Sequence, residues 1–196
     1  MTEKPLSQEE ILQLPLQYFE GQILLIDSIP DLKNVIQSLQ CSSVLGFDTE
    51  TKPSFRKGHT NSVALVQLCD GKTAFLIRLH HREFVQQLRT IFENPSIIKA
   101  GVAIHDDLKG LKKLYNFVPN GFVELQTMAK EMGYSEISLK KMTARFLHFR
   151  ISKNQQTSNW NSQNLTHAQQ IYAATDAWVS YLIYNKLTEL KKQNQK

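Results

Sequence analysis

The sequence contains little cysteine and no long run of apolar residues. Its 196 residues include 2 cysteines, Cys41 and Cys69, which are not in a C-x-x-C spacing. Neither a disulfide-stabilised scaffold nor a cysteine-based zinc site is therefore indicated. No apolar stretch approaches the roughly 20 residues that a membrane-spanning helix requires. Residues 1–10 are polar and acidic, unlike a secretory signal, so we expect an intracellular, cytoplasmic protein with no membrane partner.

Basic residues are scarce at the start of the chain and abundant elsewhere. Residues 1–50 contain 2 Lys or Arg residues and 8 Asp or Glu residues, whereas residues 51–196 contain 21 and 10. The formal net charge of the whole chain is +5. A basic body is typical of proteins with a polyanionic partner such as nucleic acid. The alternative is a solvated surface that happens to be basic.

The pattern of apolar residues predicts one α/β domain. Strand-like segments lie at 22–28, 43–50, 62–69, 73–79 and 97–103, and a short apolar segment lies at 121–125. Helical patterns lie at 31–40, 82–93, 106–115, 125–132, 138–147 and 165–191, with Thr166 and Gln169 as a capping box. Asp70-Gly71 is a tight-hairpin signal. We expect a mixed sheet covered by helices, with 1–22 as an N-terminal arm, 23–191 as the domain and 192–196 as a frayed tail.

Two acidic residues end the second of these strand-like segments. Asp48 and Glu50 are two positions apart, so in a strand their side chains share one face, roughly 7 Å from each other. If that face is buried, both charges lose water and repel each other, which is costly unless a positive group is bound. Either the strand has already reached solvent, or the pair is half of a cation site.

Two further segments carry acidic residues next to apolar ones. Asp106 and Asp107 follow an apolar strand end, at the start of a predicted helix. An Asp there caps the helix amides, and we assign this role to Asp106, which leaves Asp107 for another. Asp176 is the one acid in an apolar helical stretch, where Tyr172 lies one turn before it on the same face. A buried salt bridge to a lysine is the alternative explanation for Asp176.

An α/β fold can bring four of these acids into one pocket, namely Asp48, Glu50, Asp107 and Asp176. Clustered carboxylates repel each other unless cations neutralise them, and oxygen ligands without His or Cys suit Mg²⁺ or Mn²⁺. Two such ions roughly 3.5–4 Å apart form the clamp used for in-line displacement at phosphorus. The ions would bridge the carboxylates to phosphate, while nearby Lys and Arg residues hold the rest of a strand. The sequence therefore predicts a two-metal site that acts on nucleic acid.

Three motifs, in this order, resemble those of a known enzyme family. "FDTE" (47–50), "HDDL" (105–108) and "YAATD" (172–176) are similar to the three motifs of the DEDD-type 3′–5′ exonucleases. The Tyr four residues before the last Asp is typical of the DEDDy subgroup, which includes ribonuclease D and the Werner-helicase exonuclease domain. The segment "SVALVQLCD" (62–70) is more similar to Werner-type domains, and the resemblance spans roughly residues 23–190.

The resemblance implies a ribonuclease-H-like α/β fold with a five-stranded mixed sheet flanked by helices. It implies that Asp48, Glu50, Asp107 and Asp176 ligate two metal ions, and that Tyr172 orients or deprotonates the attacking water. It also implies hydrolysis of phosphodiester bonds from the 3′ end of DNA, in single strands or recessed ends, with release of nucleoside 5′-monophosphates. Because the ordinary pKa of Tyr is about 10, metal-lowered acidity of the water must supply much of its activation.

Candidate substrate contacts lie outside the metal site. They are Thr49, Lys52, Arg56, Lys57, Lys153 and Trp160. Lys52, Arg56 and Lys57 belong to a polar insert at 51–62, for which a solvated loop is the alternative. Trp160 is placed either to stack on a base or to pack near a helix start.

Two alternative functions fit the same residues. DNA and RNA differ by a 2′-hydroxyl whose contacts no motif here assigns, so RNA trimming similar to that of ribonuclease D is one of them. The other is a non-catalytic module that binds nucleic acid or protein; such a module need not keep its ligands, whereas all four acids and the Tyr are present. We see no helicase motif, so we expect any helicase or repair partner to be a separate chain. A monomer is compatible with the sequence.

Overall fold

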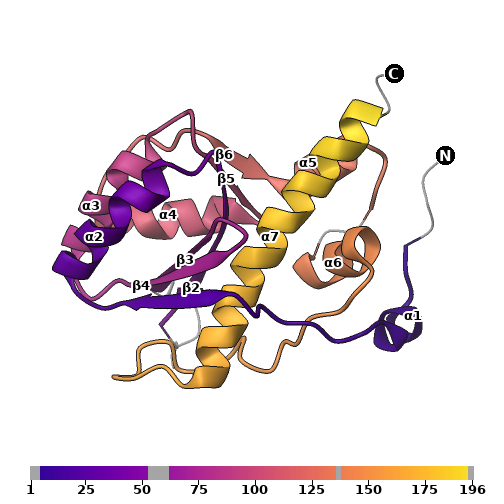
Figure 1. The fold of residues 1–196 in the computed structure, drawn as a ribbon, viewed down its shortest axis with the longest axis horizontal. Helices are drawn as coiled ribbons and strands as arrows, with labels where there is room; N and C mark the ends of the chain where they lie inside the picture. The colour runs from indigo at the N-terminus through magenta and orange to yellow at the C-terminus, as the bar shows by residue number, and fades with distance from the viewer. Residues whose placement is uncertain (1–4, 53–61, 136–137, 194–196) are drawn as a thin grey trace.

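The computed structural model describes residues 5–52, 62–135 and 138–193, and within them a mixed sheet lies between two groups of helices (Figure 1). The strands are β1 (Gln22–Ile26), β2 (Val44–Thr51), β3 (Val63–Cys69), β4 (Thr73–Arg78), β5 (Ile98–Gly101) and β6 (Phe122–Glu124). The helices are α1 (Gln8–Gln13), α2 (Ile29–Gln40), α3 (Arg82–Phe92), α4 (Ile104–Leu114), α5 (Leu125–Glu131), α6 (Leu139–Leu147) and α7 (His167–Gln193).

The sheet combines parallel and antiparallel pairs in the order β1-β4-β3-β2-β5-β6. Strands β2, β3 and β4 pair antiparallel, whereas β1 joins β4, β5 joins β2 and β6 joins β5 in parallel. The predicted mixed sheet flanked by helices is confirmed, but it has six strands where five were predicted. The additional strand β6 has three residues with half-buried side chains, which is too short for an alternating pattern to reveal.

The hairpin between β3 and β4 forms at the predicted Asp70-Gly71 turn. Gly71 has a φ of +96°, in a region that glycine adopts without steric cost. Asp70 Oδ1 accepts hydrogen bonds from the backbone amides of Lys72 at 2.8 Å and Thr73 at 2.7 Å. The carboxylate therefore satisfies amides that the turn leaves without strand partners.

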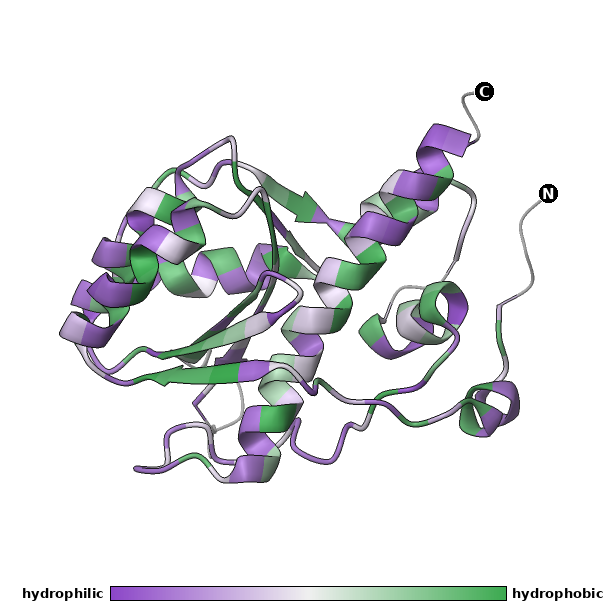
Figure 2. Ribbon diagram, viewed as in Figure 1, coloured by the Kyte–Doolittle hydropathy of each residue, from purple (hydrophilic) through white to green (hydrophobic). Residues whose placement is uncertain are grey.

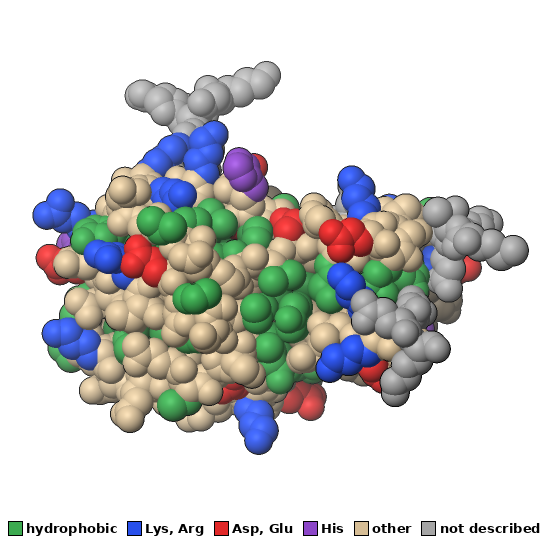
Figure 3. Space-filling model, turned by 90° about the horizontal axis from the view of Figure 1, so that it is seen from above, with side chains coloured by type: hydrophobic (Ala, Val, Ile, Leu, Met, Phe, Trp, Pro, Cys, Tyr) green, Lys and Arg blue, Asp and Glu red, His purple; other side chains and the backbone are tan. Residues whose placement is uncertain are grey.

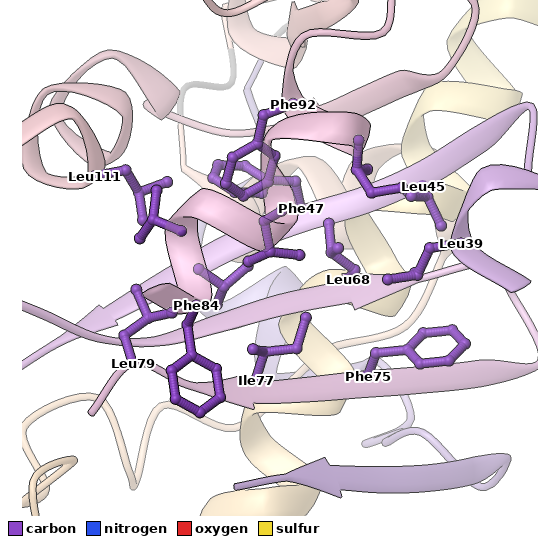
Figure 4. Close-up of a cluster of buried hydrophobic side chains, with 14 of the residues drawn as sticks. Leu39, Leu45, Phe47, Leu68, Phe75, Ile77, Leu79, Phe84, Phe92 and Leu111 are labelled. Atoms are coloured by element: carbon purple, nitrogen blue, oxygen red, sulfur yellow. The ribbon is translucent and has the colours of Figure 1, made fainter. Parts of the chain in front are cut away.

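Helices α2, α3 and α4 cover one face of the sheet. The core beneath them contains Leu39 from α2, Phe84 and Phe92 from α3, and Phe47 from β2 (Figure 4). The rings of Phe47 and Phe92 meet edge to face, with centroids 6.2 Å apart. Hydrophobic residues colour much of the central strands, while each of these helices also carries hydrophilic residues (Figure 2). Burial of each large apolar side chain contributes about 1.5–3 kcal/mol, so this layer fixes β2 in place.

Helix α7 crosses the opposite face, and Gly46 allows its backbone to approach β2 directly (Figure 1). A Cβ atom at position 46 would lie 1.9 Å from Ala177 O and 2.7 Å from Tyr181 N. Because alternate residues of a strand face the same side, Asp48 and Glu50 face α7, as Gly46 does. The fold thus places the two acids of β2 beside the helix that carries Asp176.

The start of α7 is fixed by the predicted capping box. Gln169 N donates to Thr166 Oγ1 at 3.2 Å, and Thr166 N donates to Gln169 Oε1 at 2.9 Å. These bonds satisfy free amides at the helix N-terminus. None of the described helices, α7 included, combines the length and apolarity needed to cross a membrane.

Candidate active site

The carboxyl ends of the parallel strands β2, β5 and β6 lie at one edge of the sheet. Strand β5 ends at Gly101, and its pairing with β2 stops at Gly46, whereas β2 continues to Thr51. Asp48 and Glu50 therefore lie where β2 has no strand neighbour on that side. Both side chains are half-buried.

One pocket, here called the acidic pocket, brings β2 and α7 together. Asp48 and Glu50 line it from β2, and Tyr172 and Asp176 line it from α7. Its volume is about 340 Å³. Lys153 also lines it, and its positive charge lowers the pKa of Asp176 against the effect of burial.

Asp107 does not line the acidic pocket, although its charge raises the pKa of Asp48 and of Glu50. It lies in the first turn of α4 and lines an adjoining pocket, and Thr49 lines both pockets. Thr49 Oγ1 donates a hydrogen bond of 2.5 Å to Asp107 Oδ1. The sequence predicted that four acids share one pocket; the structure brings three into it and places the fourth beside it. Among the described residues, no three Asp, Glu, His or Cys side chains are close enough to ligate one ion in this arrangement.

The carboxylates of the site raise one another's pKa values. Burial, followed by the charges of neighbouring acids, raises the pKa of Asp48 well above its ordinary value and that of Glu50 to about 9. Burial raises the pKa of Asp176, which is 6% exposed, to about 7, although a hydrogen bond with Tyr172 opposes the shift. Burial also raises the pKa of Asp107 to about 6, while the hydrogen bond from Thr49 lowers it. Burial and like charges that lie close together both favour the protonated form of a carboxyl group.

Tyr172 keeps its proton at neutral pH. Burial raises the pKa of its hydroxyl above the ordinary value, and the charges of Asp176 and Glu50 raise it further. A protonated phenol can donate a hydrogen bond, but it cannot accept a proton from water. The two roles expected for Tyr172, orientation and deprotonation of the attacking water, both stay predictions.

Glu124 is a residue of the site region that the sequence analysis missed. Its carboxylate accepts hydrogen bonds from the backbone amides of Ala103 at 3.1 Å and Ile104 at 2.9 Å. The prediction that Asp106 caps α4 was therefore wrong: the helix begins at Ile104, so Asp106 lies inside its exposed first turn. The sequence did contain a signal for Glu124: it is an acidic residue in the short apolar segment 121–125, much as Asp48 follows the apolar residues of its own strand.

The predicted substrate contacts have different outcomes. Trp160 is 2% exposed and packs 5.9 Å from the ring of Tyr172, so it supports that ring and cannot stack on a base. Thr49 is buried and bonded to Asp107. Lys52 is half-buried just past the end of β2, and Arg56 and Lys57 lie outside the described residues. On the face shown in Figure 3, Lys and Arg side chains lie in several separate places, with hydrophobic and uncharged polar surface between them.

The sequence matches one protein-family model and several characterised proteins. The model of a 3′–5′ exonuclease domain matches residues 24–191. The bifunctional 3′–5′ exonuclease/ATP-dependent helicase WRN of Mus musculus is 33% identical over 200 residues, which cover 96% of this chain and 14% of that protein. Exonuclease 3′–5′ domain-containing protein 2 of Drosophila melanogaster is 32% identical over 161 residues, with 80% of this chain and 27% of that protein covered. The chain therefore spans a minor part of these longer relatives.

Solved structures share the fold at lower sequence identity. The Nibbler EXO domain of Aedes aegypti has a TM-score of 0.82 at 21% identity, and the match covers 91% of this chain and 94% of that one. RNase D of Escherichia coli has a TM-score of 0.77 at 22% identity, and the match covers 88% of this chain and 46% of the RNase D chain. These likenesses confirm the ribonuclease-H-like fold class. Because the family model spans residues 24–191, the chain belongs to the 3′–5′ exonuclease family.

Proposed function

We propose that this chain is a metal-dependent 3′–5′ exonuclease that acts on DNA. Water attacks the phosphorus between the last two nucleotides, and the bond from phosphorus to the 3′ oxygen breaks. The shortened strand keeps a 3′-hydroxyl, and the terminal nucleotide leaves as a 5′-monophosphate. Membership of a family of metal-dependent exonucleases supports this proposal.

The observation that carries the proposal is the composition of the acidic pocket. Asp48 and Glu50 of β2 and Asp176 of α7 line it with carboxylate oxygens. The backbones of β2 and α7 are in close contact at Gly46, which holds these acids near each other. Burial raises the pKa of all three carboxyls, and the charges of neighbouring acids raise those of Asp48 and Glu50 further. A non-catalytic binding module has no need for such a costly cluster.

The side chains fit a hard divalent cation such as Mg²⁺ or Mn²⁺. Asp48, Glu50, Asp107 and Asp176 would hold two such ions, which requires Asp107 to turn from Thr49 toward the acidic pocket. The ions, when bound, supply charge neutralisation at the phosphate and lower the pKa of the attacking water.

The remaining residues of the acidic pocket position the reactants. The hydroxyl of Tyr172 donates to Asp176 and orients the attacking water by accepting a hydrogen bond from it, and the buried ring of Trp160 supports the ring of Tyr172. Lys153, on the rim, attracts the phosphate backbone. A cytoplasmic location and a monomeric state stay predictions, as does a separate helicase or repair partner.

The test is digestion of a single-stranded DNA oligonucleotide labelled at its 5′ end, in Mg²⁺ or Mn²⁺. We expect a ladder that shortens from the 3′ end, disappears in EDTA and falls roughly hundredfold in rate in Asp176→Asn. Parallel RNA oligonucleotides decide between DNA and RNA, and faster digestion of RNA would replace the proposed substrate by the alternative.

The matched control is Asp106→Asn, which removes an exposed carboxylate beside Asp107. It should digest DNA at the wild-type rate. Equal digestion by wild type and Asp176→Asn would rule out the proposed site. Binding of DNA without any cleavage in either metal would favour the non-catalytic module.

A further inference from the structure

A second pocket, here called the arm pocket, adjoins the acidic pocket. Leu16 and Tyr18 of the segment that precedes β1 line one side of it, and the first turns of α7 line the other. Its volume is about 330 Å³. Ser152 and Tyr172 line both pockets. A strand with a phosphate at the acids therefore has a direct path into the arm pocket.

Hydrogen bonds fix the arm on both sides of Tyr18. Arg150 N donates to Pro15 O at 2.9 Å, and Gln17 N donates to Arg150 O at 3.0 Å. On the other side, Phe19 N donates to Thr175 Oγ1 at 3.0 Å, and Thr175 lies on α7 between Tyr172 and Asp176. The arm is thus attached to the turn of helix that carries the candidate active-site residues. Tyr18 stands on an anchored backbone.

The chemistry of the arm pocket suits a flat, uncharged group. Tyr18 is 51% exposed and Leu16 is 47% exposed, so each offers apolar surface to an occupant. Gln17, Asn154 and Gln155 add amide groups that can both donate and accept hydrogen bonds. No Asp, Glu, Lys or Arg is among the described residues that line this pocket, and His167 is the one histidine among them. A phosphate would find no permanently charged side chain there, and a metal ion no carboxylate.

We propose that the arm pocket binds one nucleobase of the substrate strand, next to the phosphodiester that is cleaved, with Tyr18 as its stacking surface. Every base has an aromatic face, so stacking on Tyr holds a single strand with little sequence preference. The amides contact the base edge. This inference rests on the proposed exonuclease function, because continuity with the acidic pocket identifies the strand as the occupant.

The test measures KM and kcat on 5′-labelled single-stranded DNA in which one abasic nucleotide is placed in turn at each position near the 3′ end. For the wild type we expect an abasic nucleotide at one position to raise KM about tenfold, in line with the loss of one stacked base. Tyr18→Ala should raise KM about tenfold on the intact strand and show no further rise at that abasic position. Tyr18→Phe should behave as the wild type.

Leu12→Ala is the matched control, because Leu12 is a 52% exposed residue of α1 that lies outside the arm pocket. It should leave KM and the abasic effect unchanged. A direct readout uses 2-aminopurine at the sensitive position, with binding followed in EDTA. Its fluorescence should be quenched by the wild type and by Leu12→Ala but not by Tyr18→Ala.

Three results would overturn the inference. They are an equal abasic effect in wild type and Tyr18→Ala, no abasic effect at any position, and quenching that Tyr18→Ala retains. Each of them, with an active wild type, refutes the base site while the exonuclease function stands. A wild type that cleaves no oligonucleotide refutes the proposed function itself.

Discussion

The hydroxyl of Thr49 donates a 2.5 Å hydrogen bond to the carboxylate of Asp107. Thr49 stands between Asp48 and Glu50, so its side chain points to the face of β2 opposite theirs. One strand therefore presents two acids to α7 and holds a third acid, on α4, from its other face. A segment of three residues thus organises both sides of the candidate active site.

Loss of this bond should change the ionisation of Asp107. The bond lowers the pKa of Asp107 against the effect of burial, so Thr49→Val, which keeps the shape and removes the donor, should raise that pKa by about one unit. Carboxyl NMR titration of the metal-free protein measures it. Thr51→Val, at the exposed end of the same strand, is the control and should leave the pKa unchanged. A fall in the pKa of Asp107 in Thr49→Val contradicts the expected role of the bond.

A methyl group at position 46 should separate β2 from α7. In Gly46→Ala the new Cβ would lie 1.9 Å from Ala177 O, a backbone atom that cannot move without the helix. We expect a loss of about 3 kcal/mol or more in the free energy of unfolding, together with a fall in kcat because Asp48 and Asp176 move apart. Urea unfolding and steady-state kinetics measure the two effects.

Gly110→Ala provides the comparison for Gly46→Ala. There the added Cβ meets a side-chain methyl group, Val63 Cγ2 at 2.8 Å, and alanine gains about 1 kcal/mol over glycine inside a helix. The net change should be smaller than in Gly46→Ala. Similar losses in the two variants would show that the contact of β2 with α7 is less tight than its geometry indicates.

Removal of the Glu124 carboxylate should loosen the start of α4 and so displace Asp107. Glu124 accepts hydrogen bonds from the backbone amides of Ala103 and Ile104. Ala103 has a φ of +59°, which is unfavourable for a residue other than glycine. Glu124→Ala should lower the free energy of unfolding by about 1–2 kcal/mol and reduce kcat more than it changes KM. Glu124→Gln keeps an acceptor and should restore part of kcat.

Glu131→Ala is the control for Glu124→Ala. Glu131 forms an exposed ion pair with Lys191 at 3.7 Å, and such pairs contribute little to stability. Both stability and kcat should stay at wild-type values. An unchanged kcat in Glu124→Ala, with Asp107 in its wild-type environment by NMR, would limit Glu124 to a structural role.

The stability of the metal-free protein should fall as the pH rises. Folded-state pKa values of about 7 for Asp176 and about 9 for Glu50 lie above the ordinary values of these groups, so the folded state binds protons more tightly than the unfolded state. This contribution is fully present below about pH 4 and is lost as the pH rises toward 9. The slope should reach about 1.4 kcal/mol per pH unit for each extra proton bound. Urea unfolding in EDTA between pH 5 and 9 measures it.

A substitution and the addition of a metal ion test the origin of this dependence of stability on pH. Asp176→Asn removes one of the repelling charges and should flatten the slope, whereas Glu131→Gln, in an exposed ion pair with Lys191, should not. Mg²⁺ or Mn²⁺ at pH 8 should raise the free energy of unfolding of the wild type and have less effect on Asp176→Asn. An identical slope in wild type and Asp176→Asn would place the proton-linked groups elsewhere in the protein.

Much of the fold follows from local patterns of residues. Gly71 adopts the backbone angles of a tight turn, and Thr166 caps α7 through a residue only three positions away. Because both features depend on residues close in sequence, they can be predicted without knowledge of the tertiary structure. Long periodic segments, such as those that form α3 and α7, are recognisable for the same reason. Strand β6 is not, because three half-buried residues become a strand only when β5 lies beside them.

The sequence by itself determined the chemical identity of the candidate site: its acids and Tyr172 stand in three ordered motifs, and their spacing on a strand and a helix follows from backbone geometry. Only the tertiary structure decided how these side chains meet. It turned Asp107 toward Thr49, buried Trp160 behind Tyr172, and brought Glu124 to the start of α4 and Tyr18 to the edge of the pocket. The physical reason is that hydrogen bonding, burial and mutual repulsion depend on groups far apart in the chain, which become neighbours only when the sheet and α7 have packed.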